Sequence, residues 1–152
     1  MKPYPLQWLL GFALLAGCQP SADKQPVAEE TTHSSVTSCY QYLQGNDTVS
    51  LRLVQTGLLV TGDLTYNLFE KDKNRGTIKG AFAGDTLFAD YTFQSEGMES
   101  VREVAFLKQN SALAEGYGEI KEIDGKMRFT DKSQLSFEHV QLRIIPCEAV
   151  KF

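Results

Sequence analysis

Histidine and cysteine are scarce in this 152-residue sequence, which contains two histidines, His33 and His139, and three cysteines. No two cysteines are spaced as in a CxxC motif, so the chain has a poor ligand set for a metal, and we expect no metal site. His139 has no serine or cysteine in a recognisable nucleophile motif beside it. These absences argue against an enzyme, and we predict a protein without catalytic residues and without a cofactor.

Basic clusters are also absent. The formal net charge of the chain is -4 at pH 7, which is mildly acidic. A protein that recognises nucleic acid, or that docks on anionic lipid through charge, needs a positively charged face. We therefore expect no nucleic-acid partner.

The N-terminus has the pattern of a secretory signal peptide. Lys2 is followed by an apolar run from Leu6 to Leu15 that only Gln7 interrupts. A run of about ten residues is too short to span a bilayer as a helix, for which roughly 20 are needed. We predict that residues 1–17 are a targeting segment.

The motif Leu15-Ala16-Gly17-Cys18 ends this segment and resembles the lipobox of bacterial lipoproteins. The resemblance implies diacylation of the Cys18 thiol, cleavage before Cys18 and acylation of the new N-terminus, whereas the alternative is an ordinary signal peptide with a chance cysteine. Several acyl chains form a stable membrane anchor where one would be marginal. Gln19, in place of Asp, resembles the sorting signal of some Gram-negative lipoproteins for the outer membrane. We therefore predict a lipid-anchored protein of the bacterial cell envelope.

Residues 18–37 are rich in Ser, Thr, Pro and charged residues and contain almost nothing that could enter a core. Segments of such low hydrophobicity stay disordered and act as linkers. We predict a tether that holds residues 38–152, which are enough for one domain, away from the lipid surface.

With Cys18 acylated, Cys39 and Cys147 remain, and an oxidising compartment favours a disulfide between them. Such a bridge would close a loop of about a hundred residues and contribute on the order of 4 to 5 kcal/mol in the chain-entropy model. A metal site is the competing interpretation. The disulfide also requires the first and last segments of the domain to be neighbours.

Residues 38–152 lack a persuasive helical period, and alternation of apolar and polar residues dominates instead. A short helical turn around residues 131–135 is the one exception that we allow. Turn-forming residues recur at a regular spacing, at Gly45-Asn46-Asp47, Gly57, residues 71–76, Gly84-Asp85, Glu96-Gly97, Asn110-Ser111, Asp124-Gly125 and Asp131-Lys132-Ser133. This pattern predicts an all-β domain, an antiparallel up-and-down meander that closes into a barrel of about eight strands. Glycines inside the strands, such as Gly62 and Gly80, fit a strongly coiled sheet. An open meander or a two-sheet sandwich stays possible.

The segment from Tyr91 to Phe106 and the strand after it carry an unusual density of polar residues. One account is a barrel interior that is polar at one end, with Arg102 paired to Glu96, Glu103 or Glu115, because a buried arginine needs a carboxylate partner. Such a pocket could hold a small ligand. The other account is a set of solvated ion pairs at the barrel rim, each worth well under about 1 kcal/mol. The candidate ligand or lumen cluster consists of Tyr91, Ser95, Glu96, Arg102, Glu103, Glu115 and Tyr117.

The succession CYQYL, DTVSLRL, VTGDLTYNLFEKDKNRGTIKG, GDTLFADYTFQSEGMESVREVAF and EGYGE resembles small lipoproteins of Bacteroidota to which no activity is assigned. The resemblance implies the location and a barrel-like domain. A weaker architectural analogy links the domain to calycin-type barrels and periplasmic lysozyme inhibitors, without a matching motif. Because fold does not confer function, two hypotheses follow. The chain is either a tethered, non-catalytic module that binds a small ligand in the lumen or a protein on its loops, or an envelope-associated interaction protein or hydrolase inhibitor.

Overall fold

The computed structural model describes residues 34–71, 73–95, 97–150 and 152. The predicted signal peptide, Cys18 and the predicted tether up to residue 33 lie outside the described residues, as does Glu96. β1 begins at Ser35, so regular structure starts three residues before the predicted domain boundary.

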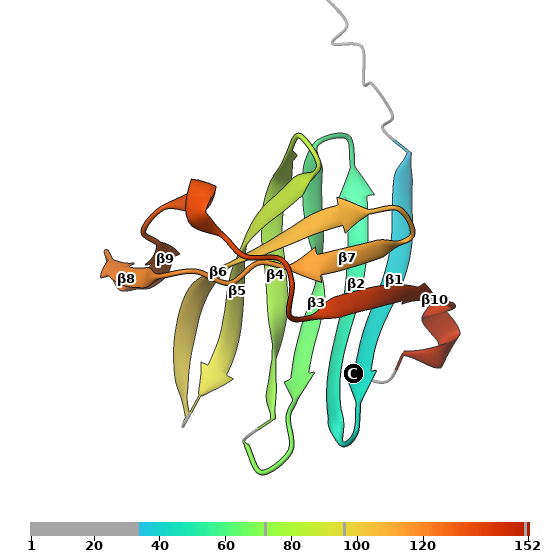
Figure 1. Ribbon diagram of the computed structural model, residues 1–152, viewed down its shortest axis with the longest axis horizontal. Coiled ribbons are helices and arrows are strands. Elements are labelled where there is room, and N and C mark those ends of the chain that lie inside the picture. The colour runs from blue at the N-terminus through green and yellow to red at the C-terminus, as the bar shows by residue number, and fades with distance from the viewer. Residues whose placement is uncertain (1–33, 72, 96, 151) are drawn as a thin grey trace, which may run out of the picture. The chain divides into compact units, whose positions relative to one another are not determined.

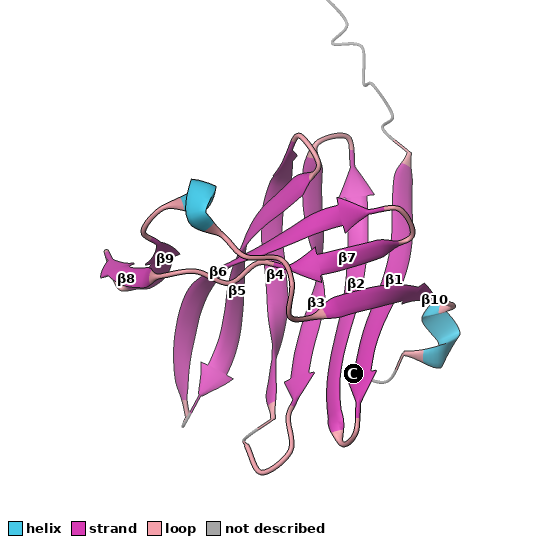
Figure 2. Ribbon diagram, viewed as in Figure 1, coloured by secondary structure: helices cyan, strands magenta, loops and turns pink. Residues whose placement is uncertain are grey.

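The described residues form ten strands and two short 3-10 turns, and no α-helix (Figure 2). The elements are β1 (Ser35–Gln44), β2 (Asp47–Thr56), β3 (Leu59–Asn67), β4 (Asn74–Ala83), β5 (Thr86–Ser95), β6 (Met98–Gln109), β7 (Ala112–Glu115), β8 (Ile120–Ile123), β9 (Lys126–Phe129), η1 (Lys132–Gln134), β10 (Gln141–Ile145) and η2 (Cys147–Ala149). η1 lies where a short helical turn was expected, and the side chain of Asp131 accepts a hydrogen bond from the Ser133 N–H there (2.9 Å). η2 was not predicted.

Eight of the strands close into an antiparallel barrel, as the turn spacing predicted. Around the ring the order is β5, β4, β3, β2, β1, β10, β7 and β6, and β6 pairs back onto β5. β1 to β5 stand side by side as the long back wall in Figure 1, and β7 and β10 cross in front of them. β10, the last strand of the chain, closes the ring by pairing with both β1 and β7.

Two-residue loops join consecutive strands at five of the barrel's turns. Gly57 has a φ of 62° in the loop that joins β2 to β3, and Asn110 has a φ of 55° in the loop that joins β6 to β7. A positive φ suits hairpin loops because it matches the twist of the flanking strands, and Gly and Asn tolerate it best. The turn residues therefore fix the hairpin register along the chain.

Alternate side chains point into the barrel and fill its centre. Leu51 on β2, Leu64 on β3 and Leu87 on β5 are fully buried, and Phe106 meets them from β6. At Gly62, also on the interior face, an added Cβ would lie 1.8 Å from the carbonyl oxygen of Arg52. This glycine allows the close approach of neighbouring strands in a coiled sheet, as expected.

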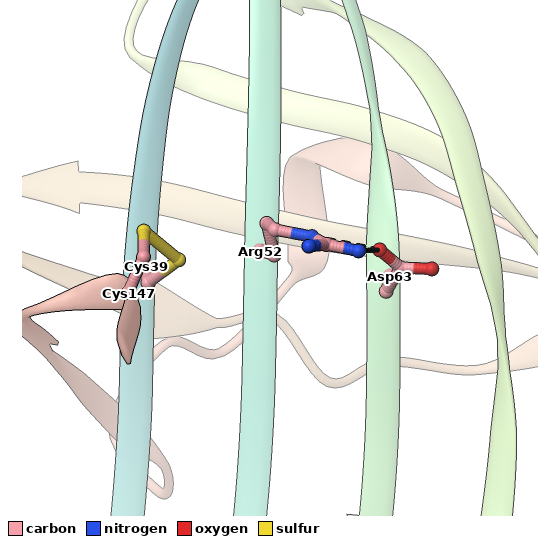
Figure 3. The surroundings of a disulfide bond; sticks show 4 residues. All are labelled: Cys39, Arg52, Asp63 and Cys147. Atoms are coloured by element: carbon pink, nitrogen blue, oxygen red, sulfur yellow. Dashed lines mark hydrogen bonds and ion pairs between the residues drawn. A yellow bond between two sulfur atoms is a disulfide. The ribbon is translucent and has the colours of Figure 1, made fainter. Parts of the chain in front are cut away.

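A disulfide joins Cys39 of β1 to Cys147 of η2, which confirms the predicted pairing. The two Cα atoms are 5.1 Å apart, and Cys39 is 1% exposed. The bridge sits beside an ion pair between Arg52 and Asp63 on the outer surface of β2 and β3 (Figure 3). The covalent link therefore ties the first strand of the barrel to the segment that follows its last strand.

The front of the barrel is less regular than the predicted meander. β6 pairs with β7 only through residues 106–109, and its earlier part pairs instead with β9, in parallel, at Val101 and Arg102. β8 and β9 form a hairpin outside the ring, on the left in Figure 1. We refer to residues 120–134, which comprise β8, β9 and η1, as the flap. On this edge β6 thus pairs with β9 along its earlier part and with β7 along its last part, and the sheet divides between these two pairings.

Candidate ligand pocket

A pocket of about 140 Å³ lies where the sheet divides. The N–H of Gly116 still donates to the carbonyl oxygen of Ala105 on β6 (2.8 Å), but the chain then leaves β6, and Tyr117 forms a two-way backbone bridge with Ser136 instead (2.8 and 2.9 Å). The departure opens the wall between β6 and the flap. The pocket is lined by Arg102, Glu103, Val104, Glu115, Gly116, Tyr117, Gly118, Ile120 and Phe129.

Arg102 occupies the interior side of this opening. Its guanidinium carbon lies over the rings of Tyr66, Tyr91 and Phe93, at 4.8, 5.5 and 5.7 Å from the ring centroids. Each such contact contributes about 0.5 to 2 kcal/mol, more when the cation is shielded from water. Arg102 is half-buried, so the aromatic rings replace part of its hydration shell.

Arg102 does not form the ion pairs expected with Glu103 or Glu115, and the third expected partner, Glu96, lies outside the described residues. Among the described residues, no carboxylate lies within ion-pairing distance of its guanidinium, and its Nε is buried without a hydrogen-bond partner. Glu115 is on the same side of the barrel but turns its oxygens to tyrosines, and Glu103 points to the opposite face. The sequence led us to expect a carboxylate partner because a buried arginine needs one, but two rings from the neighbouring β5 and one from β3 surround the guanidinium instead.

Glu115 is 4% exposed and is held by two tyrosine hydroxyls. Tyr66 donates to its Oε1 (2.5 Å), and Tyr117 donates to its Oε2 (2.9 Å). Burial raises the pKa of Glu115, while these hydrogen bonds and the charge of Arg102 oppose the shift. Burial, followed by the charge of Glu115, raises the pKa of both Tyr66 and Tyr117, so the two hydroxyls remain protonated donors.

Tyr91 lies deeper in the barrel, with its side chain fully buried. Its ring stacks on Phe93 at a centroid distance of 4.7 Å, and burial raises its pKa to about 12 despite the nearby charge of Arg102. The Tyr91 hydroxyl finds no acceptor among the described residues. Of the three buried side-chain polar atoms there without a partner, two, the Tyr91 hydroxyl and the Arg102 Nε, therefore belong to this cluster.

Glu103 lies on the outer face of β6, because adjacent residues of a strand point to opposite sides. Its carboxylate pairs with Lys132 of the flap at 2.7 Å and with Arg128 at 3.6 Å, and it accepts the backbone N–H of Phe129 (3.2 Å). The prediction that Glu103 belongs to the lumen cluster is therefore corrected: its side chain lies on the outer face of β6 and lines the pocket from that side. Ion pairs, which were anticipated in solvated form around Arg102, are formed here by Glu103, and its carboxylate is buried.

Asp90 of β5 supplies the second carboxylate that holds the flap. It pairs with Arg128 (2.5 Å) and Lys126 (3.0 Å). Burial alone would raise the pKa of Asp90, but hydrogen bonds from the two cations outweigh it and lower the pKa below its ordinary value. Ion pairs thus attach the flap to the barrel together with the backbone pairing of β9 with β6.

The structure assembles four of the seven predicted residues at the interior end of the pocket: Tyr91, Arg102, Glu115 and Tyr117. Ser95 is the last residue of β5, opposite Met98 in the hairpin, and Glu96 lies outside the described residues. The sequence analysis missed Tyr66 and Phe93, although both share the interior parity of their strands, and it missed the flap residues Ile120 and Phe129, which carried no recognisable signal.

Among the described residues, no group of three His, Cys, Asp or Glu side chains is arranged to hold a metal ion. None of those residues forms a helix long and apolar enough to cross a bilayer. The pocket offers a cation, Arg102, and apolar walls. No protein-family model, curated protein or solved structure matches this chain.

Proposed function

We propose that this chain is an exported, lipid-anchored envelope protein whose barrel binds a small ligand in the pocket beside Arg102. Cys18 carries the acyl chains, and Gln19 directs the protein to the outer membrane. The signal-peptide pattern at residues 1–17 and the LAGC motif support the anchor. The disulfide supports export, because such bonds persist in oxidising compartments.

The observation that carries the binding role is an open pocket beside a half-buried arginine that has no carboxylate partner among the described residues. Elsewhere the interior is filled by apolar side chains. A partly buried guanidinium without a hydrogen-bonding partner is unfavourable, and a ligand that accepts its hydrogen bonds would remove this cost. A volume of about 140 Å³ is close to that of an engineered cavity, of roughly 150 Å³, that takes up benzene.

Binding without catalysis fits the chemistry of the lining. No histidine, serine or cysteine lines the pocket, and both oxygens of Glu115 already accept hydrogen bonds from tyrosines. A general base would need an oxygen free to reach a substrate proton. The arrangement is suited to holding a molecule in place.

Native mass spectrometry of the protein purified from its own envelope tests the pocket. We expect a non-covalent adduct on the wild type that is lost in Ile120→Trp, because Ile120 lines the pocket and is 50% exposed, so that a larger ring can fill the space. Ile123→Trp is the matched control, since Ile123 is on the same strand, is 42% exposed and does not line the pocket. An adduct that survives Ile120→Trp would overturn the proposal.

Cell fractionation tests the anchor. Cys18→Ser should move the protein out of the outer-membrane fraction, and the wild type should carry a mass increment that corresponds to a diacylglyceryl group and an N-acyl chain. A wild-type protein of unmodified mass would contradict the lipid anchor and leave the pocket hypothesis intact.

A further inference from the structure

We infer that the ligand is a small organic anion with a flat apolar body, such as a single-ring carboxylate, whose anionic group pairs with the guanidinium of Arg102. The inference rests on the proposed binding function and specifies its ligand class. It follows from which charges around the pocket are already engaged and which one is not.

Arg102 is the charge at the pocket with which no carboxylate of the described residues pairs directly. The rings of Tyr66, Tyr91 and Phe93 provide diffuse electrostatic contact but no acceptor oxygen for its N–H groups. None of the described residues accepts a hydrogen bond from its Nε. A guanidinium is a fixed fork of donors that matches the two oxygens of a carboxylate.

The two carboxylates that line the pocket are engaged elsewhere. Glu115 accepts one tyrosine hydroxyl at each oxygen, and Glu103 pairs with Lys132 and Arg128 of the flap. A cationic ligand would therefore find no free carboxylate and would meet the repulsion of Arg102. A neutral ligand would leave the guanidinium unpaired.

The remaining walls select an apolar body. Val104 and the half-exposed Ile120 and Phe129 face the space, and Gly116 and Gly118 leave their stretch of the wall without side chains. An added Cβ at Gly116 would lie 2.8 Å from the ring of Phe137, and one at Gly118 would lie 2.6 Å from Leu135 and 3.8 Å from Phe129. These apolar walls suit the flat, apolar body of a single-ring ligand.

Three single-ring compounds of similar size but different charge separate the charge preference from the pocket itself. Benzoate, benzyl alcohol and benzylamine are titrated into the full mature chain in detergent micelles, with empty micelles as the blank, and backbone amide NMR shifts are followed. We expect benzoate to shift the amides of residues 102–104 and 115–118, with at least tenfold weaker binding of the alcohol and the amine.

Variants test the role of Arg102 in the same assay. Arg102→Gln should weaken benzoate binding at least tenfold, and Arg102→Lys less, because lysine keeps the charge without the fork. Arg52→Gln is the control, since Arg52 pairs with Asp63 on the outer surface of the barrel. Glu115→Gln should strengthen benzoate binding, because it removes a nearby negative charge.

The outcomes are distinguishable from those of the binding proposal. Equal binding of the three compounds at these amides, or preference for the amine, would overturn the anionic class while the pocket stands. If none of the three compounds shifts these amides, a single-ring anion is excluded as the ligand. The native mass spectrometry of the wild type and Ile120→Trp then decides separately whether the pocket binds a ligand.

Discussion

The back and the front of the barrel are built differently. β1 and β2 pair without interruption from Ser35 opposite Thr56 to Gln44 opposite Asp47, whereas β7 has four residues and β10 has five. Long ladders bring the interior side chains into regular rows that fill the lumen. Short strands leave the backbone free to turn away, and the pocket lies where it does so. In this barrel the pocket comes from incomplete pairing rather than from a hollow core.

The largest effect on stability should come from the disulfide between Cys39 and Cys147. Replacing Cys39 and Cys147 with serine releases a loop with a sequence separation of 108, which lowers the free energy of unfolding by about 4 to 5 kcal/mol in the chain-entropy model. Urea denaturation with and without reductant measures it. Reductant should destabilise the wild type by the same amount and leave the double variant unchanged. A difference below about 1 kcal/mol would show that ordinary pairing of β10 suffices.

Glycine substitutions should separate the back from the front. Gly62→Ala places a Cβ 1.8 Å from the carbonyl oxygen of Arg52, so the backbone of two long strands must move apart. We expect a loss of more than about 3 kcal/mol, against about 1 kcal/mol for Gly116→Ala, where the obstacle is the Phe137 ring at 2.8 Å. Thermal and chemical denaturation of both variants give the comparison. Equal losses would mean that the front is as rigid as the back.

The buried carboxylate of the front should give stability an unusual pH dependence. The pKa of Glu115 is raised above its ordinary value of 4.5 by burial, so the folded state holds the proton more tightly than the unfolded state. Its contribution to stability is therefore greatest below pH 4.5 and falls as the pH rises through the folded pKa.

Glu115→Gln, which cannot titrate, should gain stability relative to the wild type as the pH is raised from roughly 4 to 7. Denaturation midpoints of the two proteins across this range test the expectation. A difference that stays constant, or that shrinks as the pH rises, would argue against a raised pKa.

The smallest effect should come from the charges that hold the flap. Asp90→Asn removes the partner of Lys126 and Arg128, and because these groups are partly exposed the loss should stay under about 1 kcal/mol. Hydrogen exchange should nevertheless accelerate at the amides of residues 126–129. Asp63→Asn removes a comparable pair on the back wall and should leave these amides unchanged. Identical exchange in both variants would show that apolar contacts hold the flap.

The back of the barrel could be predicted from the sequence, because its determinants are local. Turn residues such as Gly57 and Gly84 set two-residue loops, and alternation of apolar residues between them sets the interior face. The disulfide could be predicted because only Cys39 and Cys147 remain once Cys18 is assigned to acylation. Their pairing in turn predicted that the first and last segments of the domain are neighbours. Each of these signals is contained within a hairpin or in one pair of residues.

The pocket could be predicted only in part. The density of polar residues identified Arg102 and Glu115, but their partners depend on which strands meet across the lumen. Tyr66 reaches Glu115 across a separation of 49 residues. β8 and β9 have four residues each, and the parallel pairing of β9 with β6 leaves no mark on either strand. Non-local contacts of this kind have no short-range sequence signature.

The division of β6 between two neighbours has a consequence for changes to the sequence. The hydrogen bonds that close the ring run from β7 to β10 and from β10 to β1, and none of these strands includes residues 117–139. That stretch can be lengthened, shortened or replaced while the ring remains intact. A change confined to this stretch can therefore place different side chains beside Arg102 while the scaffold stays the same.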